Sequence, residues 1–511
     1  MNDRVRNIVI VGGGTAGWLT AGLLGARHKD RGPNGLSITL IESPDVPTVG
    51  VGEGTWPTIR KTLARIGLSE TNFLVKCGAS FKQGSRFDRW VTGSDEDSYL
   101  HPFELPVSQN GTDMLRAWQK FAPEKSFAQA LCVQSAPGLQ NLAPRQRSMP
   151  DFVGALNYAY HLDAVKLAEM LRTHVVETLG IIHISDHVTD INGPKDGDIK
   201  SVTTRENGDI EGDLFIDCTG HRSLMLGQHY GVDFIDQSHV LFNDRALVTQ
   251  VPVDETDAIR SETISTAHEA GWIWDIGLTC RRGVGCVYAS KYMSDERAEE
   301  VLRDYINDKE LPVRLLKFQS GHRTHFWHQN CLAIGLSAGF LEPLEASAIV
   351  LVELSAEMLA ENMPVSRQTM SVEARKFNEI FKYRWARIIE FLKLHYVLSQ
   401  RTEPYWVDNR KSETIPQRLQ DNLDVWTYRP PSQYDFEQNS EVFPASSYQF
   451  IVYGMGMKPA IHPTLEPRIQ AAIQQQMQNV VKKQRAFAAG LPTNRALLAG
   501  LQKQSTQRKS A

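Results

Sequence analysis

The N-terminal segment alternates between apolar runs and glycine-rich or polar breaks. Residues 7–11 (NIVIV) form a continuous apolar, β-branched run, which predicts a buried parallel strand. The run stops at the glycine-rich residues 12–17, a helical pattern covers residues 18–26, and a second apolar run at residues 37–41 ends on Glu42. This order of strand, glycine turn, helix, strand and acid predicts the start of a doubly wound α/β domain.

Further elements of the same kind recur much later in the chain. Short apolar strands are predicted at residues 181–184, 213–217 and 332–334. The nucleotide-binding sheet is therefore expected to be assembled from distant segments, with the residues between them forming insertions. Helical spacing of apolar residues predicts amphipathic helices at 164–176, 352–361, 377–395 and 469–480, with a proline-punctuated, loop-rich stretch beyond Arg401.

Composition and charge exclude several classes of protein. The chain has 511 residues, of which 41% are hydrophobic and 22% charged, as is typical of globular proteins and not of disordered chains. The net charge of −4 gives no general argument for nucleic-acid binding. Residues 481–511 carry seven lysines and arginines and no acid. We expect this basic tail to be a solvated, partly frayed end, and contact with RNA or an acidic partner is the alternative.

Cysteine spacing and hydropathy bear on the compartment. The six cysteines lie far apart without a C-x-x-C pair, so neither a zinc site nor a disulfide framework is expected. No apolar stretch reaches about 18 residues, and the N-terminus does not have the pattern of a signal peptide. We therefore expect a soluble, cytoplasmic protein that does not associate with membranes.

The glycine turn is the first motif with chemical meaning. Gly12, Gly14 and Gly17 have G-x-G-x-x-G spacing, in which the first allows a tight turn, the second a close approach of a pyrophosphate and the third helix–strand packing. Its position between a strand and a helix, with Glu42 closing the next strand, predicts dinucleotide binding. No second such unit follows a later strand, so a bound flavin would have to arrive already reduced.

Seven motifs together resemble one enzyme family. They are GGGTAGW (12–18), VGVGEGTWP (49–57), GASFK (78–82), YLHPF (99–103), YHLDA (160–164), GWIWDIG (271–277) and GFLEPLEASA (339–348). In order and spacing they resemble the flavin-dependent halogenases of the tryptophan halogenase family up to about Arg401. The last hundred or so residues resemble that family only loosely.

The resemblance implies a fold and an activity. The fold would be an α/β, Rossmann-like FAD-binding domain of the flavin monooxygenase type with a mainly helical substrate-binding layer. Residues 1–400 would form the discontinuous FAD-binding module with substrate-facing insertions, and residues 401–511 a mainly helical region that completes the substrate site. FADH2, oxygen and halide would give hypohalous acid for use on an indole or another electron-rich aromatic substrate. A separate NAD(P)H-dependent flavin reductase would supply FADH2 to a monomer or homodimer.

Two residues match the family's catalytic positions. Lys82 would relay the halogen, either by hydrogen-bonding the oxidant or as a haloamine, and the sequence leaves both open. Glu345 would stabilise the cationic ring intermediate and assist its deprotonation. An acid that only favours a helix N-terminus is the alternative for Glu345.

The halide site would follow directly in the chain. The family's EPLESTG pattern reads Glu345-Ala346-Ser347-Ala348 here, so the backbone N–H groups of Ser347 and Ala348 would hold the halide. The methyl group of Ala348 would alter the allowed dihedral angles and the width of the pocket. We therefore expect bromide to be preferred, with chlorination still possible.

The remaining site residues follow from the same resemblance. Trp272 and Trp274 match a motif that separates flavin from substrate, although its final proline is Gly277 here; plain core aromatics are the alternative. His101 and Phe103 match residues that flank the substrate. The alternative for His101 is a histidine with purely structural contacts. The FAD contacts would be Gly12, Gly14, Thr15, Ala16, Gly17, Ser43, Glu53, Gly54, Val188, Leu336 and Ile349.

Several alternatives stay open. His322, His325 and His328 recur every three residues, but they lack a carboxylate at matching spacing, so no metal site is expected. A flavin-dependent aromatic hydroxylase is the nearest rival enzyme, and a flavin-binding sensor or inactive relative is a rival from another class. The candidate substrate lid near residues 446–456 diverges from the family. Free tryptophan, indole and larger or carrier-tethered substrates therefore remain candidates.

Overall fold

The computed structural model describes residues 4–30, 35–46, 52–107, 111–438, 440–460 and 466–510. Residues 49–51, the start of the VGVGEGTWP motif, lie outside this description. The chain divides into two compact units. Unit 1 comprises Met1–Gly78, Leu162–Gln237 and Gln319–Trp385, and unit 2 comprises Ala79–His161, Ser238–Phe318 and Ala386–Ala511.

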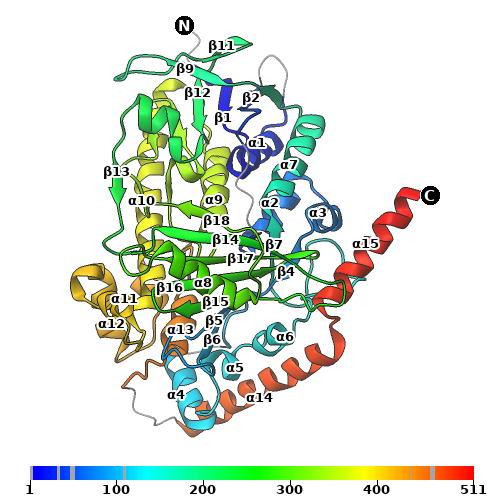
Figure 1. Ribbon diagram of the computed structural model, residues 1–511, viewed down its shortest axis with the longest axis vertical. Coiled ribbons are helices and arrows are strands. Elements are labelled where there is room, and N and C mark those ends of the chain that lie inside the picture. Colours follow the sequence, from blue (N-terminus) through cyan, green and yellow to red (C-terminus); the bar gives the residue numbers. More distant parts are fainter. Residues whose placement is uncertain are drawn as a thin grey trace. The chain divides into compact units, whose positions relative to one another are not determined.

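Unit 1 is built on a six-stranded sheet whose strands come from distant parts of the chain (Figure 1). Neighbouring strands are parallel except for the β20–β21 pair, which is antiparallel. The strand order is β20 (Trp327–His328), β21 (Cys331–Ala333), β12 (Leu214–Asp217), β1 (Asn7–Val11), β2 (Ser37–Glu42) and β8 (Ile182–Ser185). The expected assembly of the sheet from separated segments is confirmed.

Helices of unit 1 pack around the first one. Helix α1 (Thr15–Arg27) contacts α7 (Ala164–Leu179), α9 (Ser347–Glu361) and α2 (Thr58–Ile66). Helix α9 begins five residues before the expected start at 352, because its first turn (SAIVL) is almost wholly apolar and shows no helical periodicity. Unit 1 also contains the elements α3 (Glu70–Lys76), β3 (Gly52–Gly54), β9 (Val188–Asn192), β10 (Ser201–Thr204), β11 (Gly208–Glu211), β13 (Phe234–Asp236), β19 (Gly321–Arg323) and β22 (Gly339–Phe340).

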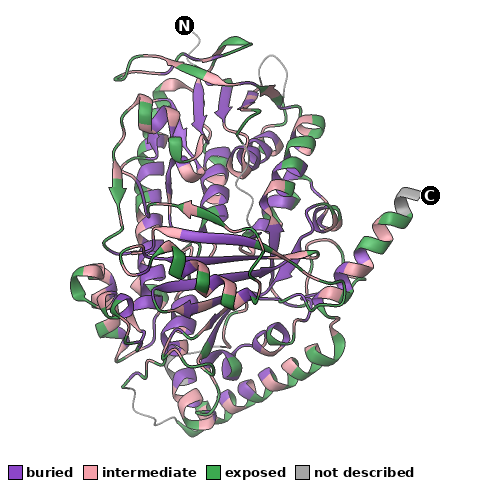
Figure 2. Ribbon diagram, viewed as in Figure 1, coloured by how far each residue is buried: buried purple, intermediate pink, exposed green. Residues whose placement is uncertain are grey.

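Unit 2 contains a seven-stranded sheet that the sequence patterns did not predict. Its neighbouring strands are antiparallel except for the parallel β15–β5 pair. The order is β18 (Arg314–Lys317), β14 (Arg245–Pro252), β17 (Arg281–Tyr288), β16 (Gly271–Gly277), β15 (Thr263–His268), β5 (Gly84–Asp88) and β6 (Ser98–Pro102). Buried residues dominate the central strands of this sheet (Figure 2), which leaves little of the hydrophobic and polar alternation that marks a half-exposed strand.

The C-terminal part of unit 2 is helical. The long helix α10 (Arg367–Val397) contributes residues to both units and leads into α11 (Pro404–Asp408), α12 (Gln417–Trp426), α13 (Ala445–Gly454), α14 (Pro467–Gly490) and α15 (Asn494–Ser510). Pro404 begins α11 and Pro416 directly precedes α12. Proline is well suited to a helix start because the first N–H groups have no partner within the helix, so the proline-rich stretch contains more helix than expected.

The other helices of unit 2 come from its earlier segments. They are α4 (Gly111–Phe121), α5 (Phe127–Leu131), α6 (Ser135–Leu139) and α8 (Asp295–Ile306). The short strands β4 (Ser80–Lys82) and β7 (Ala159–Asp163) pair in antiparallel register. No helix within the described ranges is long and apolar enough to cross a membrane.

The prediction of a solvated, partly frayed basic tail is right about exposure, since Lys482, Lys483, Arg485 and Lys503 are exposed, and wrong about fraying. Residues 481–490 belong to α14 and residues 494–510 to α15, and Leu497, Leu498 and Leu501 of α15 are buried. Asn494, the first residue of α15, is completely buried. The sequence did not predict this packing, because the apolar and amide groups that anchor the tail are few and lie between seven positive charges.

Candidate functional site

The glycine turn of unit 1 has the geometry of a dinucleotide-binding loop. A Cβ atom on Gly12, whose φ is +115°, would lie 2.1 Å from the carbonyl oxygen of Cys218, and one on Gly17 would lie 1.9 Å from the carbonyl oxygen of Gly12. Around Gly14 no atom lies within 4 Å of that position. Two glycines are thus needed for packing, whereas the third leaves open space at the N-terminus of α1, where a phosphate binds favourably.

A second segment closes on this turn. Thr15 and Ala16 begin α1, and a Cβ atom on Gly335 would lie 2.7 Å from the Cβ atom of Ala16. Gly335 starts the short 3-10 turn that also contains Leu336. Gly335, the residue before Leu336, therefore lies beside the glycine turn within unit 1.

Polar groups gather in and just after β2 and β8. The Ser43 hydroxyl lies 3.2 Å from Nδ1 of His187, the residue before Val188. Glu42 Oε2 lies 3.1 Å from Nε2 of His183, yet both atoms are buried without a well-oriented hydrogen bond. The Glu42 side chain as a whole is 23% exposed, so its carboxylate can accept a hydrogen bond from a ribose hydroxyl. Together with the open space at Gly14, these residues fit a dinucleotide such as FAD.

The GEGTWP segment connects the expected flavin residues to Glu345. Glu53 lies in β3 beside Gly54, and burial raises the pKa of Glu53 to about 7. Two residues after Gly54, Trp56 donates a 2.7 Å hydrogen bond from its indole N–H to the carbonyl oxygen of Glu345. Glu345 itself is 3% exposed. Its backbone is therefore fixed by the same segment that carries Glu53.

Helix α9 begins directly after Glu345 and has no side-chain cap. Ala346 takes a left-handed conformation with φ of +54°, and Ser347 and Ala348 form the first turn of the helix. Their N–H groups have no acceptor within the helix, so they can bind an anion. The sequence predicted that the methyl group of Ala348 would alter the backbone dihedral angles. Ala348 is instead helical, a conformation that alanine adopts readily, so the backbone is not restricted there. Ile349 follows in the same turn and is buried.

Lys82 lies in unit 2 and is buried. It ends β4, where it pairs with Ala159 of β7, and it is 1% exposed. Its Nζ atom lies 5.5 Å from the centre of the Phe103 ring. Burial of an ammonium group is costly without compensation, and the ring face supplies some attraction for the charge. The structure thus brings Lys82 together with Phe103, one of the expected substrate residues.

His101 is held by the C-terminal helices. Its Nε2 atom shares a 2.9 Å hydrogen bond with the hydroxyl of Ser447 in α13. Its ring lies 5.7 Å from that of Phe391 and 6.2 Å from that of Phe450, measured between ring centres. A histidine with purely structural contacts would also have such a hydrogen bond, which joins the region near 446–456 to one of the expected substrate residues.

The two tryptophans of β16 point to one face of the seven-stranded sheet. Their ring centres lie 6.3 Å apart, and a Cβ atom on Gly285 in the neighbouring strand would lie within 2.6 Å of the Trp274 ring. The indole N–H of Trp274 is buried and has no hydrogen-bond partner in the described chain. Gly277 ends the strand, pairs with Arg282 and accepts a hydrogen bond from Ser80. The missing proline therefore leaves a residue that is fixed by other contacts.

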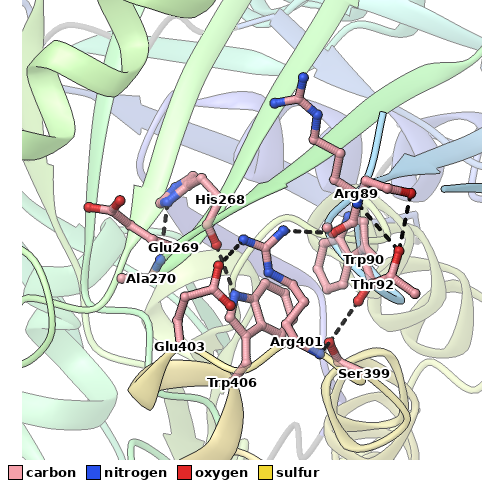
Figure 3. A network of polar contacts seen from close by, with 12 residues as sticks. Arg89, Trp90, Thr92, His268, Glu269, Ala270, Ser399, Arg401, Glu403 and Trp406 are labelled. Atoms are coloured by element: carbon pink, nitrogen blue, oxygen red, sulfur yellow. Dashed lines mark hydrogen bonds and ion pairs between the residues drawn. The ribbon is translucent and has the colours of Figure 1, made fainter. Parts of the chain in front are cut away.

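Trp90, which packs against Trp272, lies within a network of polar contacts (Figure 3). Trp90 lies 6.4 Å from Trp272 and 5.4 Å from Trp406, measured between ring centres. The Trp406 indole N–H donates to the carbonyl oxygen of His268 over 2.8 Å. Arg401 covers the face of Trp406 and donates to the carbonyl oxygen of Arg89 over 2.9 Å. Trp272 therefore packs against Trp90, which belongs to a cluster of aromatic side chains held by hydrogen bonds.

The sequence interpretation gave no role to several residues that the structure places near Lys82. His161 is buried, shares a 2.9 Å hydrogen bond with Thr263 and lies opposite Ser80 in the β4–β7 pair. Burial, with the positive charge of Lys82, holds the pKa of His161 well below its usual value. His161 belongs to the YHLDA motif, which was the available signal. Asn494 had no such signal, since it lies in the poorly matching tail.

The three spaced histidines do not converge. His322 packs against Phe326 and Trp385, His325 is exposed, and His328 packs edge-on against Tyr230. No group of three or more metal-ligating side chains occurs in the part of the chain that the structure describes.

The expected site residues fall into two sets. Unit 1 contains all the expected FAD contacts together with Glu345, Ser347 and Ala348. Unit 2 contains Lys82, His101, Phe103, Trp272 and Trp274.

Comparisons with known proteins agree on one family. The family model for tryptophan halogenase matches residues 7–470. Tryptophan 6-halogenase SttH of Streptomyces toxytricini is 33% identical, and the match covers 95% of this chain and 96% of that protein. Tryptophan 7-halogenase RebH of Lentzea aerocolonigenes is 29% identical over 96% of this chain and 98% of its own. The crystal structure of a tryptophan halogenase from Shewanella frigidimarina NCIMB 400 superposes with a TM-score of 0.95 at 45% identity, covering 98% of each chain.

Proposed function

Because the chain belongs to the tryptophan halogenase family of flavin-dependent halogenases, we propose that it uses FADH2, oxygen and a halide to halogenate an indole or another electron-rich aromatic substrate. The observation that carries this proposal is a buried lysine, Lys82, beside the ring of Phe103. A lysine in such surroundings is suited to chemistry rather than to solvation.

Unit 1 would hold the flavin. The N–H groups around Gly14 would bind the pyrophosphate, the polar groups of Glu42 and Ser43 the adenosine part, and Leu336 and Ile349 the flavin ring. When bound, reduced FAD with oxygen supplies the two oxidising equivalents that convert halide to hypohalous acid. The first turn of α9, with Ser347 and Ala348, would hold the halide beforehand.

Lys82 would direct the electrophilic halogen at the ring. Its ammonium group either hydrogen-bonds hypohalous acid or, once deprotonated, accepts the halogen as a haloamine with release of water. In both routes a carbon–halogen bond forms, the bond from halogen to oxygen or nitrogen breaks, and a ring proton is lost. Glu345 would stabilise the cationic ring and accept this proton. The hydrogen bond from Trp56 to the Glu345 backbone supports that role, because a general base must be held in place.

The substrate would be a small aromatic molecule that packs against His101 and Phe103. SttH and RebH are tryptophan 6- and 7-halogenases, which supports an indole. The contact of Ser447 with His101 supports the proposal that residues 401–511 complete the substrate site of the module formed by residues 1–400. Free tryptophan, indole and larger or carrier-tethered indoles all remain candidates.

We further propose that bromide is preferred over chloride. The support is the methyl group of Ala348, where the family pattern has glycine, at the first turn of α9. This added volume changes the width of the pocket without changing the backbone. Bromide and chloride offered together at equal concentration should give mainly brominated product, and equal or faster chlorination would refute the preference.

The enzyme would need a separate NAD(P)H-dependent flavin reductase. The chain has one G-x-G-x-x-G turn and no second one after a later strand, which supports delivery of FADH2 from another protein. Reductases of this kind and their nicotinamide cofactors are available in the cytoplasm, which supports a cytoplasmic location for the proposed monomer or homodimer.

The decisive test replaces Lys82. Purified Lys82→Ala would be incubated with a flavin reductase, NADH, FAD, bromide or chloride and a panel of indoles, and products would be identified by mass spectrometry. We expect FAD binding to be unchanged and halogenated product to fall by about a hundredfold or more. Lys76→Ala, an exposed lysine on α3, is the matched control and should behave as wild type.

Two outcomes would contradict the proposal. Halogenated product from Lys82→Ala at the wild-type rate would remove the lysine from the mechanism. A wild-type product that contains added oxygen and no halogen would favour the alternative, a flavin-dependent aromatic hydroxylase.

A further inference from the structure

The strand that carries Lys82 is buried, and one of its two backbone edges has no neighbouring strand. Strand β4 has only three residues and lies at the end of its sheet, with β7 on one side. Successive residues of a strand direct their backbone N–H and C=O groups to opposite sides. The groups of Phe81, between Ser80 and Lys82, therefore face away from β7. Since Phe81 is completely buried, these groups need another partner.

Asn494 provides that partner. Its side-chain amide donates a 3.0 Å hydrogen bond to the carbonyl oxygen of Phe81, and its amide oxygen accepts a 3.4 Å hydrogen bond from the N–H of Phe81. Asn494 is itself completely buried. One amide group thus replaces a neighbouring strand at the position directly before Lys82.

Asn494 is in turn fixed by its own surroundings. Its backbone N–H donates to the carbonyl oxygen of Asn141, and the residue before it, Thr493, forms a β-bridge with Leu142. The carbonyl oxygen of Leu142 also accepts hydrogen bonds from Gln83, the residue after Lys82, and from Ser261. The start of α15 and the segment after Lys82 are therefore tied to the same short stretch of chain, residues 141–143.

We propose that Asn494 is a positioning residue for Lys82, acting through the backbone of Phe81. The inference rests on the proposed role of Lys82. The conformation of a three-residue strand is set by its partners more than by its own length. Loss of the amide would free the Phe81 backbone and move the lysine relative to Phe103, and a small displacement of a reacting group is costly in rate.

Asn494→Asp tests the clamp with almost no change in side-chain volume. A carboxylate still accepts from the N–H of Phe81 but faces its carbonyl oxygen without a proton to donate. We expect kcat for halogenation to fall by about tenfold or more, with the KM for the aromatic substrate and the Kd for FAD within about twofold of wild type. Asn494→Ala should show the same pattern.

Leu501→Ala is the matched control for loss of stability in α15. It removes buried apolar contacts of the same helix without altering any bond to Phe81, so it should lower the Tm and leave kcat of the folded enzyme near wild type. All variants are assayed well below their Tm, with circular dichroism confirming that they are folded.

The outcomes separate this inference from the proposed function. Wild-type kcat in both Asn494→Asp and Asn494→Ala, while Lys82→Ala is inactive, would overturn the clamp alone. A fall in kcat of Leu501→Ala equal to that of Asn494→Asp would also overturn it, because the effect would then follow from stability. Full activity of Lys82→Ala would instead overturn the proposed function.

Discussion

The glycine turn of unit 1 and the Lys82 strand of unit 2 achieve precision in different ways. Within the glycine turn, Gly17 packs against the backbone of Gly12 and the open space lies at Gly14 between them, with Cys218 as the one distant residue that packs closely against Gly12. The Lys82 strand depends on groups far away in the chain. The Phe81 backbone is held by a residue 413 positions later, and Ser80 donates to Gly277, 197 positions later.

This difference explains what each region requires for its function. A phosphate-binding turn needs a backbone shape, which a few local residues can encode. A buried reactive lysine needs a defined position in a low-dielectric environment, which only tertiary contacts can supply. Substitutions should therefore act locally in the first region and at long range in the second.

The largest expected effect is in the glycine turn. In Gly17→Ala the new methyl group would meet the backbone of Gly12 at 1.9 Å. Neither atom can move without opening the turn, so we expect a loss of about 3 kcal/mol or more in unfolding free energy and loss of FAD binding. Urea unfolding of the FAD-free protein and FAD titration would measure the two effects.

Gly14→Ala is the matched control at the same turn. Gly14 has φ of −74°, which alanine adopts readily, and no atom lies within 4 Å of the new methyl group. The unfolding free energy should change by less than about 0.5 kcal/mol, while FAD binding weakens because the methyl group takes up the space of the cofactor. Equal destabilisation by both variants would contradict the division of roles among the glycines.

The same contrast decides what could be predicted from the sequence. The parallel strands, α1 and the glycine turn were predicted because apolar runs and glycine spacing encode them locally. The seven-stranded sheet was not predicted, since strands such as β16 and β17 are buried on both faces and show no alternation. Lys82 and His101 were found only by resemblance to a family. Asn494 was missed because nothing near it in sequence marks an amide that pairs with Phe81.

A smaller effect is expected from a buried carboxyl group in unit 1. Glu353 of α9 accepts hydrogen bonds from Thr58 and Thr62 of α2, at 3.1 Å and 2.5 Å, and burial raises its pKa to about 8. The unfolded chain has a lower glutamate pKa, about 4.3, so the folded state binds more protons between these values. Protonation of Glu353 therefore stabilises the folded state. This contribution is fully present below the unfolded pKa and is lost as the pH rises through about 8.

Glu353→Gln should remove this dependence. Between about pH 5 and about pH 8, the unfolding free energy of wild type should fall more steeply with rising pH than that of the variant. The difference in slope should be up to about 1.4 kcal/mol per pH unit, measured by urea unfolding. Glu262 and Glu390 of unit 2 also have raised pKa values, and they remain in both proteins, so the difference isolates Glu353. Glu361→Gln, an exposed acid at the end of α9, is the control, and parallel pH curves for all three proteins would contradict the assignment.

The smallest expected effect tests whether the long-range principle extends to the substrate residues. Ser447→Ala removes the hydrogen bond to His101, which should cost about 1 kcal/mol of stability. Without this hydrogen bond the His101 ring should bind the aromatic substrate less well, so that KM rises by about two- to tenfold with little change in kcat. Ser446→Ala, on the same helix but without a contact to His101 among the described bonds, is the control. If both serine variants have wild-type KM values, α13 covers His101 without orienting it, and only the Lys82 strand depends on distant residues for its chemistry.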